Sequence, residues 1–530
     1  MHIPGSFRIA GGFPAGFALL LSASFAAAAA TAEVAPPLWS AVEVSSEQID
    51  RAIAAIDGLA HGLMERTGLP GMAVAVVRND QVVYSRGFGI RKAGHPEPVD
   101  ADTVFQLASV SKSVGATVVA AAAGRGWTAW NRPVAEMLPW FRLSDPYVTR
   151  NLTVGDLYSH RSGLPDHAGD SLEDLGYGRA EVLRRLRYLP LSPFRVTHTY
   201  TNFGLTAAAE AVAAARGTTW ARLSQELIYE PLGMTSTSSE FSGYLARRNR
   251  AVGHVREGGS WVARHVRQPD AQSPAGGVSS SVKDMAQWMR LVLALGTPDG
   301  KAMVAREPLV EALTPQIRSS STSRPDYRSS SYGYGVGVSD DGTGRVRLGH
   351  SGAFLLGAAT SFALLPSENL GVITLTNGSP IGIPEALNAS FLDMVETGRV
   401  QRDWLTALTP IFAPMYANPG VLAGRPRPPN PAPSRDLRAY VGTYANAYYG
   451  EAEVSRAGND LVLALGPEPK RFRLSHWSGD QFAYEPVGEN AVGTAAVWFR
   501  ADSAGRVRAL EVENFEEGVR ILPKRRGRHP

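Results

Sequence analysis

The chain of 530 residues contains no cysteine. This absence excludes a disulfide framework, a thiol nucleophile, a thiolate metal site and a lipid anchor attached to cysteine. Lysine is also scarce, because only six of the 53 basic residues are lysine and arginine supplies the rest. One of the six, Lys112, lies in the apolar, small-residue segment FQLASVSKSVGA. A lysine in such a segment calls for a specific explanation.

Charge of one sign is not in excess, since the formal net charge is only +4. A composition of 44% hydrophobic and 19% charged residues is typical of a globular protein that buries a full core. Apart from the final KRRGRHP, no dense basic cluster suggests nucleic-acid binding. The length predicts at least two domains.

The first 32 residues have the pattern of a cleaved secretory signal. A single arginine precedes an apolar stretch from about Phe17 to Ala30, and small residues follow it. The stretch is too short and too rich in alanine to be a convincing membrane span. We expect a mature chain that begins near Glu33 and is secreted or periplasmic. A membrane anchor that is retained after export is the alternative.

The remaining chain divides by composition. Residues 33–412 read as mixed helix and strand, and residues 413–436 are dense in proline, which is typical of a stiff linker. From 437 to 523, short β-rich runs alternate with the turn signals GND, SGD and SAG. This pattern predicts a small antiparallel barrel or sandwich, followed by a basic tail at 524–530.

Two β-rich groups lie at opposite ends of the first domain. GMAVAVVRNDQVVYSRGFG predicts a hairpin, and RVRLGHSG with FLLGAATSFALLPSENLGVITLTNG predicts more strands about 260 residues later. Between them, from about Ser109 to Val310, helix and loop prevail. An amphipathic helix from Ile49 to Leu63, after a capping box at Ser45, opens the domain. We therefore predict an α/β (α+β) fold with one antiparallel sheet, flanking helices and an inserted helical lobe.

Ser109 and Lys112 suit nucleophilic catalysis. If a helix begins near Ser109, Lys112 follows one turn later on the same face, where its amine reaches the serine oxygen. The positive end of the helix also favours a developing alkoxide. Arginine could not replace this lysine, because a desolvated lysine can release a proton and an arginine does not. The plainer alternative is an ordinary N-cap serine followed by a surface lysine.

The same spacing occurs a second time, at Ser280 and Lys283. This copy follows two glycines and precedes the amphipathic segment DMAQWMRLVLAL. We interpret it as a capping turn with an exposed lysine. The Ser-x-x-Lys pattern by itself therefore does not identify a nucleophile.

Further motifs follow in a fixed order, namely Tyr200-Thr201-Asn202 and then His350-Ser351-Gly352 at the start of an apolar strand. With them the sequence resembles the serine β-lactamase and penicillin-binding protein superfamily. The branch it resembles comprises class C β-lactamases, DD-carboxypeptidases, D-aminopeptidases and related carboxylesterases. LTVGDLYSHRSGLP and SPAGGVSSSVKDMAQW support the resemblance, which covers nearly all of residues 45–395. It implies a β-lactamase-like, transpeptidase-type fold.

The resemblance also implies roles for single residues. Ser109 matches the acylated nucleophile, Lys112 its partner in proton transfer, and Tyr200 the base or proton relay. Asn202 matches the side chain that holds the substrate amide. The backbone N–H groups of Ser109 and Ala353 would form the oxyanion hole.

The third motif departs from many relatives, which have Lys-Thr-Gly there. His350, Ser351, Gly352 and Ala353 are the expected substrate-binding residues in this chain. The His-Ser-Gly form occurs in peptidase-like members, and it disfavours penicillin hydrolysis. The residues after the linker resemble the small lipocalin-like barrels that follow the hydrolase domain in some relatives. Such a barrel is expected to cover the active-site mouth or to mediate homo-oligomers, and the alternative is that its aromatic residues merely fill its own core.

Physical chemistry supports a base at this site. Free tyrosine, with a pKa of about 10, is a poor base at neutral pH, but a nearby ammonium lowers that value. Lys112 or His350 could supply the charge to Tyr200. Hydrolysis through an acyl-enzyme needs neither a metal nor an organic cofactor. Asn202 could alternatively cap the next helix, His350 could be a structural histidine at a strand end, and we interpret His160 as structural.

Three functions remain. The first is an exported serine hydrolase that cleaves D-amino-acid peptides or small esters and amides. The second is a class C-like β-lactamase, and the third is a slow receptor that binds peptidoglycan fragments or β-lactams. No His-Glu-x-x-His motif supports a zinc hydrolase, and GHSGA lacks the second glycine of a nucleophile elbow. The expected partner is a small molecule or short peptide.

Overall fold

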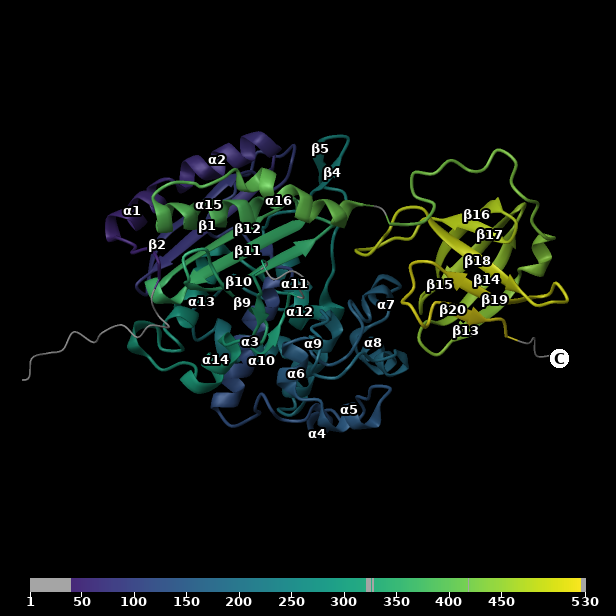
Figure 1. The fold of residues 1–530 in the computed structure, drawn as a ribbon, viewed down its shortest axis with the longest axis horizontal. Coiled ribbons are helices and arrows are strands. Elements are labelled where there is room, and N and C mark those ends of the chain that lie inside the picture. Colours follow the sequence, from purple (N-terminus) through teal and green to yellow (C-terminus); the bar gives the residue numbers. More distant parts are fainter. Residues whose placement is uncertain (1–39, 321–325, 327, 418, 526–530) are drawn as a thin grey trace, which may run out of the picture. The chain divides into compact units, whose positions relative to one another are not determined.

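The sheet of the first domain is antiparallel and has eight strands in the order β2-β1-β12-β11-β10-β9-β8-β7 (Figure 1). The N-terminal hairpin pairs with β12, with Ala75 opposite Ile373, so strands from both ends of the domain meet as predicted. β1 and β12 are buried along nearly their whole length, because helices cover both faces of the sheet. The strands are β1 Gly71–Arg78, β2 Gln81–Gly89, β7 Ile317–Arg318, β8 Ser331–Tyr332, β9 Gly337–Asp340, β10 Val346–Phe354, β11 Ala358–Leu365 and β12 Leu370–Thr376.

This computed structural model describes residues 40–320, 326, 328–417 and 419–525. The predicted secretory signal and the end of the basic tail lie outside the described residues. In the part of the chain that the structure describes, no helix combines the length and the apolar character needed to cross a bilayer.

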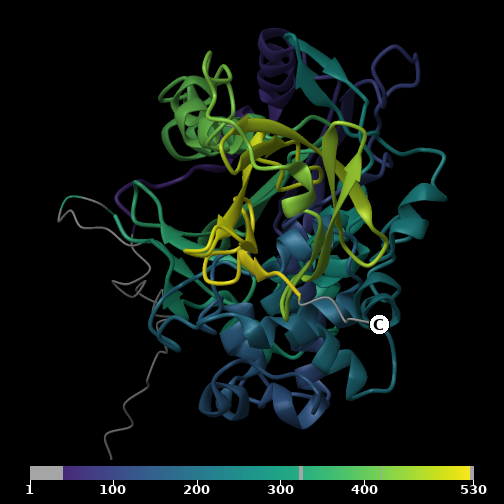
Figure 2. The same cartoon turned by 90° about the vertical axis from the view of Figure 1, so that its right-hand side faces the viewer.

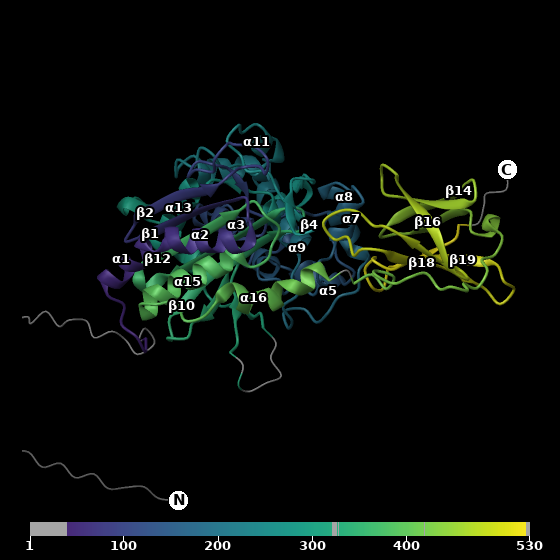
Figure 3. The same cartoon turned by 90° about the horizontal axis from the view of Figure 1, so that it is seen from above.

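One face of the sheet is covered by helices from the two ends of the domain, and Figure 3 shows α15 alongside α1 and α2. Ser45 caps α1, since its Oγ accepts a hydrogen bond from the N–H of Gln48 at 3.2 Å. The single helix predicted for this region is instead two consecutive helices joined at Ala55. The φ and ψ of Ala55 remain helical, so the apolar residues stay toward the sheet. The helices are α1 Ser46–Ala54, α2 Ile56–Thr67, α15 Ile383–Thr397 and α16 Trp404–Phe412.

The other face carries the inserted helical lobe that the sequence predicts. Its central helix, α3, is buried from Val110 to Ala122, because its small and apolar residues leave no polar face. Two short pairs of strands accompany the helices: β3 (Phe105–Gln106) with β6 (Ser279–Ser280), and β4 (Val255–Glu257) with β5 (Ser260–Val262). The helices are α3 Val110–Gly124, α4 Val134–Met137, α5 Pro146–Asn151, α6 Val154–Tyr158, α7 Asp170–Asp174, α8 Arg179–Arg185, α9 Asn202–Ala214, α10 Trp220–Ser224, α11 Phe241–Leu245, α12 Ser273–Gly276, α13 Val282–Leu293 and α14 Arg306–Leu313.

The C-terminal strands pair in sequence order into a second antiparallel sheet, which curves into a nearly closed barrel (Figure 2). Tyr444 in its first strand bridges Lys524, just after its last strand. Tyr440, Tyr444 and Phe482 lie in the barrel core, whereas Trp477 and Trp498 pack outside it. The strands are β13 Gly442–Asn446, β14 Gly450–Ala457, β15 Asp460–Leu465, β16 Lys470–Ser478, β17 Gln481–Tyr484, β18 Ala495–Ala501, β19 Val507–Val512 and β20 Ile521–Pro523.

Candidate active site

Ser109 lies at the N-terminus of α3, directly after a tight turn. The preceding residue, Ala108, has a φ of +47°, a conformation that L-residues seldom adopt. Although Ser109 occupies the N-cap position, its side chain makes no capping hydrogen bond. The hydroxyl instead meets Lys112 and Tyr200.

Lys112 is completely buried, and its Nζ has three hydrogen-bond acceptors. These are Ser109 Oγ at 3.0 Å, Asn202 Oδ1 at 2.7 Å and the carbonyl oxygen of Ala275 at 2.9 Å. Burial lowers the pKa of Lys112 to about 7, and the negative charge of Asp170 opposes this shift. Lysine 112 therefore changes its charge near neutral pH.

The same geometry decides where the lone pair of a neutral Lys112 points. An amide oxygen and a carbonyl oxygen can only accept hydrogen bonds, so the two N–H bonds of the neutral amine stay on Asn202 and Ala275. The lone pair then faces Ser109 Oγ, whose O–H can donate to it. This arrangement suits proton abstraction from the serine.

Tyr200 lies on the other side of the serine. Its O–H donates to Ser109 Oγ at 2.8 Å, and Nζ of Lys112 is 4.6 Å from the centre of its ring. Burial raises the pKa of Tyr200 well above its usual value. The sequence-based expectation of a lowered pKa is therefore wrong, because desolvation of the phenolate prevails and Lys112 itself titrates near pH 7. Tyr200 is a neutral hydrogen-bond donor.

Asn202 is the first residue of α9, yet its side chain does not cap that helix. Its Nδ2 donates to Oδ2 of Asp170 at 2.8 Å, which turns Oδ1 toward Lys112. The same carboxylate oxygen accepts the Nδ1–H of His167 at 2.8 Å. Asp170 thus fixes the orientation of the Asn202 amide. Sequence reasoning missed His167, which lies in a loop, and Asp170, which begins the short helix α7. Neither has a recognisable spacing to the three motifs.

His350 in the third motif is uncharged. Its Nδ1–H donates to the carbonyl oxygen of Ser351 at 2.7 Å, and its Nε2 accepts the O–H of Tyr332 at 2.7 Å. Burial, followed by the charge of Lys112, lowers the pKa of His350 to about 3. His350 therefore cannot supply the positive charge that we considered for it, and its ring is 6.4 Å from that of Tyr200.

β10 passes directly against the backbone of Ser109. A Cβ on Gly352 would lie 2.2 Å from the carbonyl oxygen of Leu107 and 2.9 Å from the backbone nitrogen of Ser109. Only glycine fits there, and Ala353 follows it. Ser351 faces the opposite side of the sheet, where its Oγ is 3.4 Å from Ser361 Oγ. The use of the Ala353 N–H in an oxyanion hole stays a prediction.

One edge of β10 is open to an extended ligand. Its pairing with β9 ends at Gly349, opposite Gly337, whereas its pairing with β11 continues to Phe354. The edge that follows Gly349 offers backbone groups to which a substrate can add as a short strand.

The barrel contributes a carboxylate close to the site. Glu489, in the loop between β17 and β18, accepts hydrogen bonds from the N–H of Leu355 and, at 3.4 Å, from that of Leu356. Both residues directly follow β10. Arg267 donates to Glu173 at 2.6 Å and lies 3.8 Å from Glu489. Burial raises the pKa of Glu489 to about 8, and Arg267 limits the rise. The barrel loop therefore supports the end of the strand that carries the third motif.

No metal site accompanies these groups: within the described ranges, no group of three or more His, Asp or Glu side chains is arranged to hold a metal ion. A serine hydrogen-bonded to a buried lysine and a tyrosine, beside an antiparallel sheet, is the arrangement expected of a serine hydrolase of the β-lactamase type. The family model described as Beta-lactamase matches residues 56–389, and the chain belongs to this family. A domain of unknown function, DUF3471, matches residues 426–522.

Among known proteins, the chain is similar to the Unguisins hydrolase ungD of Aspergillus violaceofuscus, with 25% identity over 84% of this chain and 85% of that protein. It is also 27% identical to the D-alanyl-D-alanine-carboxypeptidase/endopeptidase AmpH of Escherichia coli, over 52% of this chain and 69% of AmpH. The octameric penicillin-binding protein homologue from Pyrococcus abyssi shares the fold. That structure aligns with a TM-score of 0.57 and 19% identity over 89% of this chain and all of its own.

Proposed function

We propose that this protein is an exported serine hydrolase that forms an acyl-enzyme on Ser109. Its substrates are small amides or esters, namely D-amino-acid peptides or short esters. The observation that carries the proposal is the convergence of Lys112 and Tyr200 on one serine oxygen, with the lysine buried and its pKa near 7. The leader-like N-terminal sequence supports export, and assembly as a homo-oligomer stays a prediction.

Acylation begins with the neutral form of Lys112. Its lone pair takes the proton of Ser109, and Oγ bonds to the substrate carbonyl carbon. The N–H groups of Ser109 and Ala353 stabilise the oxyanion. When the intermediate collapses, the bond to the leaving amine or alcohol breaks and the leaving group takes a proton from Tyr200. Tyr200 then regains a proton from Lys112, which returns to its neutral form.

In deacylation, a water molecule attacks the acyl-enzyme and Lys112 again acts as the base. Lys112 takes a proton from the water while the oxygen of the water bonds to the acyl carbon. The bond from that carbon to Ser109 Oγ breaks, and the serine regains a proton. The products are a carboxylic acid and the free enzyme.

The neutral third motif favours a peptidase or esterase over a β-lactamase. A penicillin carries a carboxylate, which a cation at the start of this strand would bind. His350 offers no such charge, since burial holds its pKa at about 3. The name of one relative, a D-alanyl-D-alanine-carboxypeptidase/endopeptidase, agrees with cleavage of amide bonds, and another relative is named as a hydrolase.

The test uses the purified protein without its leader and three substrates: a p-nitrophenyl ester, a D-alanyl peptide amide that has no free carboxylate, and a penicillin. Intact mass is read beside product release, with Ser109→Ala as the control. We expect turnover of the ester or the peptide and an acyl adduct that is absent from Ser109→Ala. Faster turnover of the penicillin would favour a β-lactamase, and an adduct that accumulates without turnover would favour a receptor. Activity that survives in Ser109→Ala would reject the mechanism.

A further inference from the structure

Tyr200 lies in a loop, although its hydroxyl must meet Ser109 with a defined geometry. Residues 189–201 form neither a helix nor a strand, and most of residues 192–197 are exposed. A misplacement of about 1 Å in a reacting group can cost about 10²-fold in rate. Another part of the fold must therefore hold this loop in place.

One residue, His160, bonds to the backbone on both sides of Tyr200. The carbonyl oxygen of His160 accepts the N–H of Thr199 at 2.8 Å, and its Nδ1 accepts the N–H of Thr201 at 3.2 Å. A further bond runs from the N–H of His167 to the carbonyl oxygen of Tyr200 at 2.8 Å. Of these three bonds, only the one to Nδ1 depends on a side chain. It is therefore the bond that a substitution can remove.

The backbone of His160 is itself held in place, two residues after α6 ends. Its N–H donates to the carbonyl oxygen of Leu157 at 3.2 Å, and its φ is +57°. Histidine, asparagine and aspartate adopt this left-handed conformation more often than other residues with a side chain. The carbonyl oxygen of the next residue, Arg161, accepts the N–H of Arg195 at 2.9 Å. The loop that carries Tyr200 is thus bonded to two successive residues of this segment.

The ring of His160 is neutral and has a defined tautomer. The residue is completely buried, and this burial, followed by the charge of Lys112, lowers its pKa well below the usual value. Because Nδ1 accepts the N–H of Thr201, the single ring proton is on Nε2. His160 therefore remains an acceptor for Thr201 over the pH range in which Lys112 titrates. Its ring centre also lies 4.5 Å from that of Tyr200.

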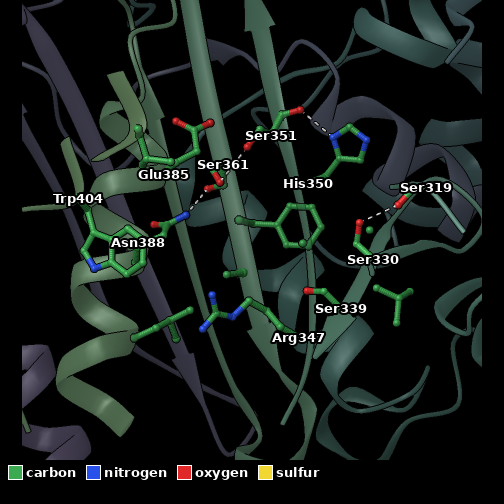
Figure 4. A pocket seen from close by; sticks show the side chains of 18 of the residues that line it. Ser319, Ser330, Ser339, Arg347, His350, Ser351, Ser361, Glu385, Asn388 and Trp404 are labelled. Carbon is green, nitrogen blue, oxygen red and sulfur yellow. Dashed lines mark hydrogen bonds between the residues drawn. The ribbon is translucent and has the colours of Figure 1, made fainter. Parts of the chain in front are cut away.

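The contacts of His160 extend to the third motif through Tyr332. The two ring centres are 5.1 Å apart, and the O–H of Tyr332 donates to Nε2 of His350 at 2.7 Å. Figure 4 shows His350 on β10, beside a cavity of about 440 Å³ that is bounded on its other side by residues of α15. The residues that line this cavity include neither Ser109 nor its two hydrogen-bond partners. The cavity is thus separate from the contacts that hold Tyr200.

We propose that His160 is a positioning residue, which fixes the loop through Thr201 so that Tyr200 directs its O–H at Ser109 Oγ and protonates the leaving group. This inference rests on the proposed serine hydrolase function and adds a residue outside the three motifs. Its consequence is selective, because a poor leaving group needs a proton as it departs and a good one does not. Loss of the acceptor on His160 should therefore slow the reaction of substrates with poor leaving groups most.

Two esters with the same acyl group test the proposal. 4-Nitrophenyl acetate releases a stable phenolate, whereas 4-nitrobenzyl acetate releases an alkoxide that needs a proton. The values of kcat/KM are compared, since they include no step after acylation, and the rate of Ser109→Ala is subtracted. His160→Gly tolerates the positive φ but has no acceptor, so we expect it to lower kcat/KM about tenfold more for the benzyl ester. In His160→Asn, Oδ1 can accept the N–H of Thr201, and the ratio of the two values should stay within about threefold of the parent.

Two further variants complete the test. Tyr200→Phe should change the ratio at least as much as His160→Gly does, and His160→Gly added to it should change the ratio no further. His254→Gly is the matched control, because His254 is equally buried and also accepts a backbone N–H, that of Ala93 at 2.9 Å. It should leave the ratio unchanged, whatever its effect on stability.

An unchanged ratio in His160→Gly, or an equal change of the ratio in His160→Asn or in His254→Gly, would overturn the role of His160 while the serine hydrolase stands. An unchanged ratio in Tyr200→Phe would reject Tyr200 as the proton donor and the positioning role with it. Absence of ester turnover that depends on Ser109 would instead reject the proposed function. If His160→Gly does not fold, ¹⁵N NMR of the unmodified protein decides, because a proton on Nδ1 of His160 at neutral pH would also overturn the proposal.

Discussion

The chain contains the pattern Ser-x-x-Lys twice, and the two copies have opposite surroundings. Lys112 is fully buried and has only uncharged acceptors, and burial lowers its pKa to about 7. Lys283 is exposed and lies 3.0 Å from Asp102, and the hydrogen bond to this carboxylate, followed by its negative charge, raises the pKa of Lys283. The difference shows that the spacing alone does not determine the burial or the partners of the lysine. A lysine becomes a base when it is buried without a carboxylate partner.

The two serines differ in the same way. The hydroxyl of Ser109 is free of capping and meets both Lys112 and Tyr200. Ser280 Oγ bonds to Thr237 at 2.7 Å and donates weakly to the carbonyl oxygen of Ser281, which is itself the N-cap of α13. The second copy is a capping turn, as the sequence predicts.

The largest expected effect comes from removing each serine hydroxyl. Ser109→Ala should lower kcat/KM for a p-nitrophenyl ester by at least about 10³-fold, because the bond-forming oxygen is lost. Ser280→Ala should stay within about twofold, since its hydroxyl makes only structural hydrogen bonds. Circular dichroism verifies that both variants fold. A comparable loss of kcat/KM in Ser280→Ala would contradict the difference between the two serines.

The two lysines should differ almost as much. Lys112→Arg should lower kcat by about 10²- to 10⁴-fold, because a guanidinium keeps the charge but cannot accept the serine proton. Lys283→Arg preserves the exposed ion pair and should leave kcat unchanged. Steady-state kinetics on one ester decide the matter. A fully active Lys112→Arg would show that its charge matters and that its basicity does not.

The pH dependence of kcat/KM follows from the lowered pKa of Lys112. The neutral amine forms above its pKa of about 7, so kcat/KM should rise tenfold per pH unit below pH 7 and level off above it. In Lys112→Arg this limb should disappear. A rate that falls between pH 6 and 8 would contradict a lysine base.

Asp170→Asn should have a smaller effect with two parts. Asp170 raises the pKa of Lys112, so its neutralisation should shift the acidic limb to lower pH. The Asn202 amide also loses its fixed orientation, and we expect the plateau to fall about tenfold. Asp166→Asn, which neutralises a nearby exposed acid that does not contact Asn202, is the control. A lower plateau with an unshifted limb would leave Asp170 a purely structural role.

The smallest effect concerns Glu489, whose pKa, like that of Lys112, is shifted mainly by burial. Its pKa is raised to about 8, so its contribution to stability is full below pH 4.5 and is lost as the pH rises through 8. Glu489→Gln should remove this loss, and we expect the variant to gain about 1 kcal/mol relative to the parent at pH 9 but not at pH 5. Thermal unfolding at both pH values measures it. A pH-independent difference would contradict the shift.

Much of the fold could be predicted because its signals are local. The hairpin of β1 and β2, the strands β10 to β12 and the inserted helices all follow from periodicity and turn residues. The structure also brings Ser109, Lys112, Tyr200 and Asn202 into one hydrogen-bonded group, although their catalytic roles stay predictions.

The features that could not be predicted from the sequence depend on burial and contacts in the folded chain. The raised pKa of Tyr200 and the neutral His350 result from desolvation, which a short motif does not reveal. Asp170, Tyr332 and Glu489 lie near the site because of contacts that their positions in the sequence do not predict. The periodic apolar pattern predicts a helix in this region, but it does not predict that the helix is interrupted at Ala55.

The most direct test of the account is the titration of the lysine side chains themselves. Only six lysines are present, so selective ¹³C labelling at Cε followed by NMR gives few resonances. We predict that one resonance titrates near pH 7 and is missing from Lys112→Arg, while that of Lys283 titrates at a higher pH than a free lysine. If the resonance that disappears in Lys112→Arg titrates above pH 10 instead, Lys112 is an ordinary ammonium and the lysine-base mechanism is wrong.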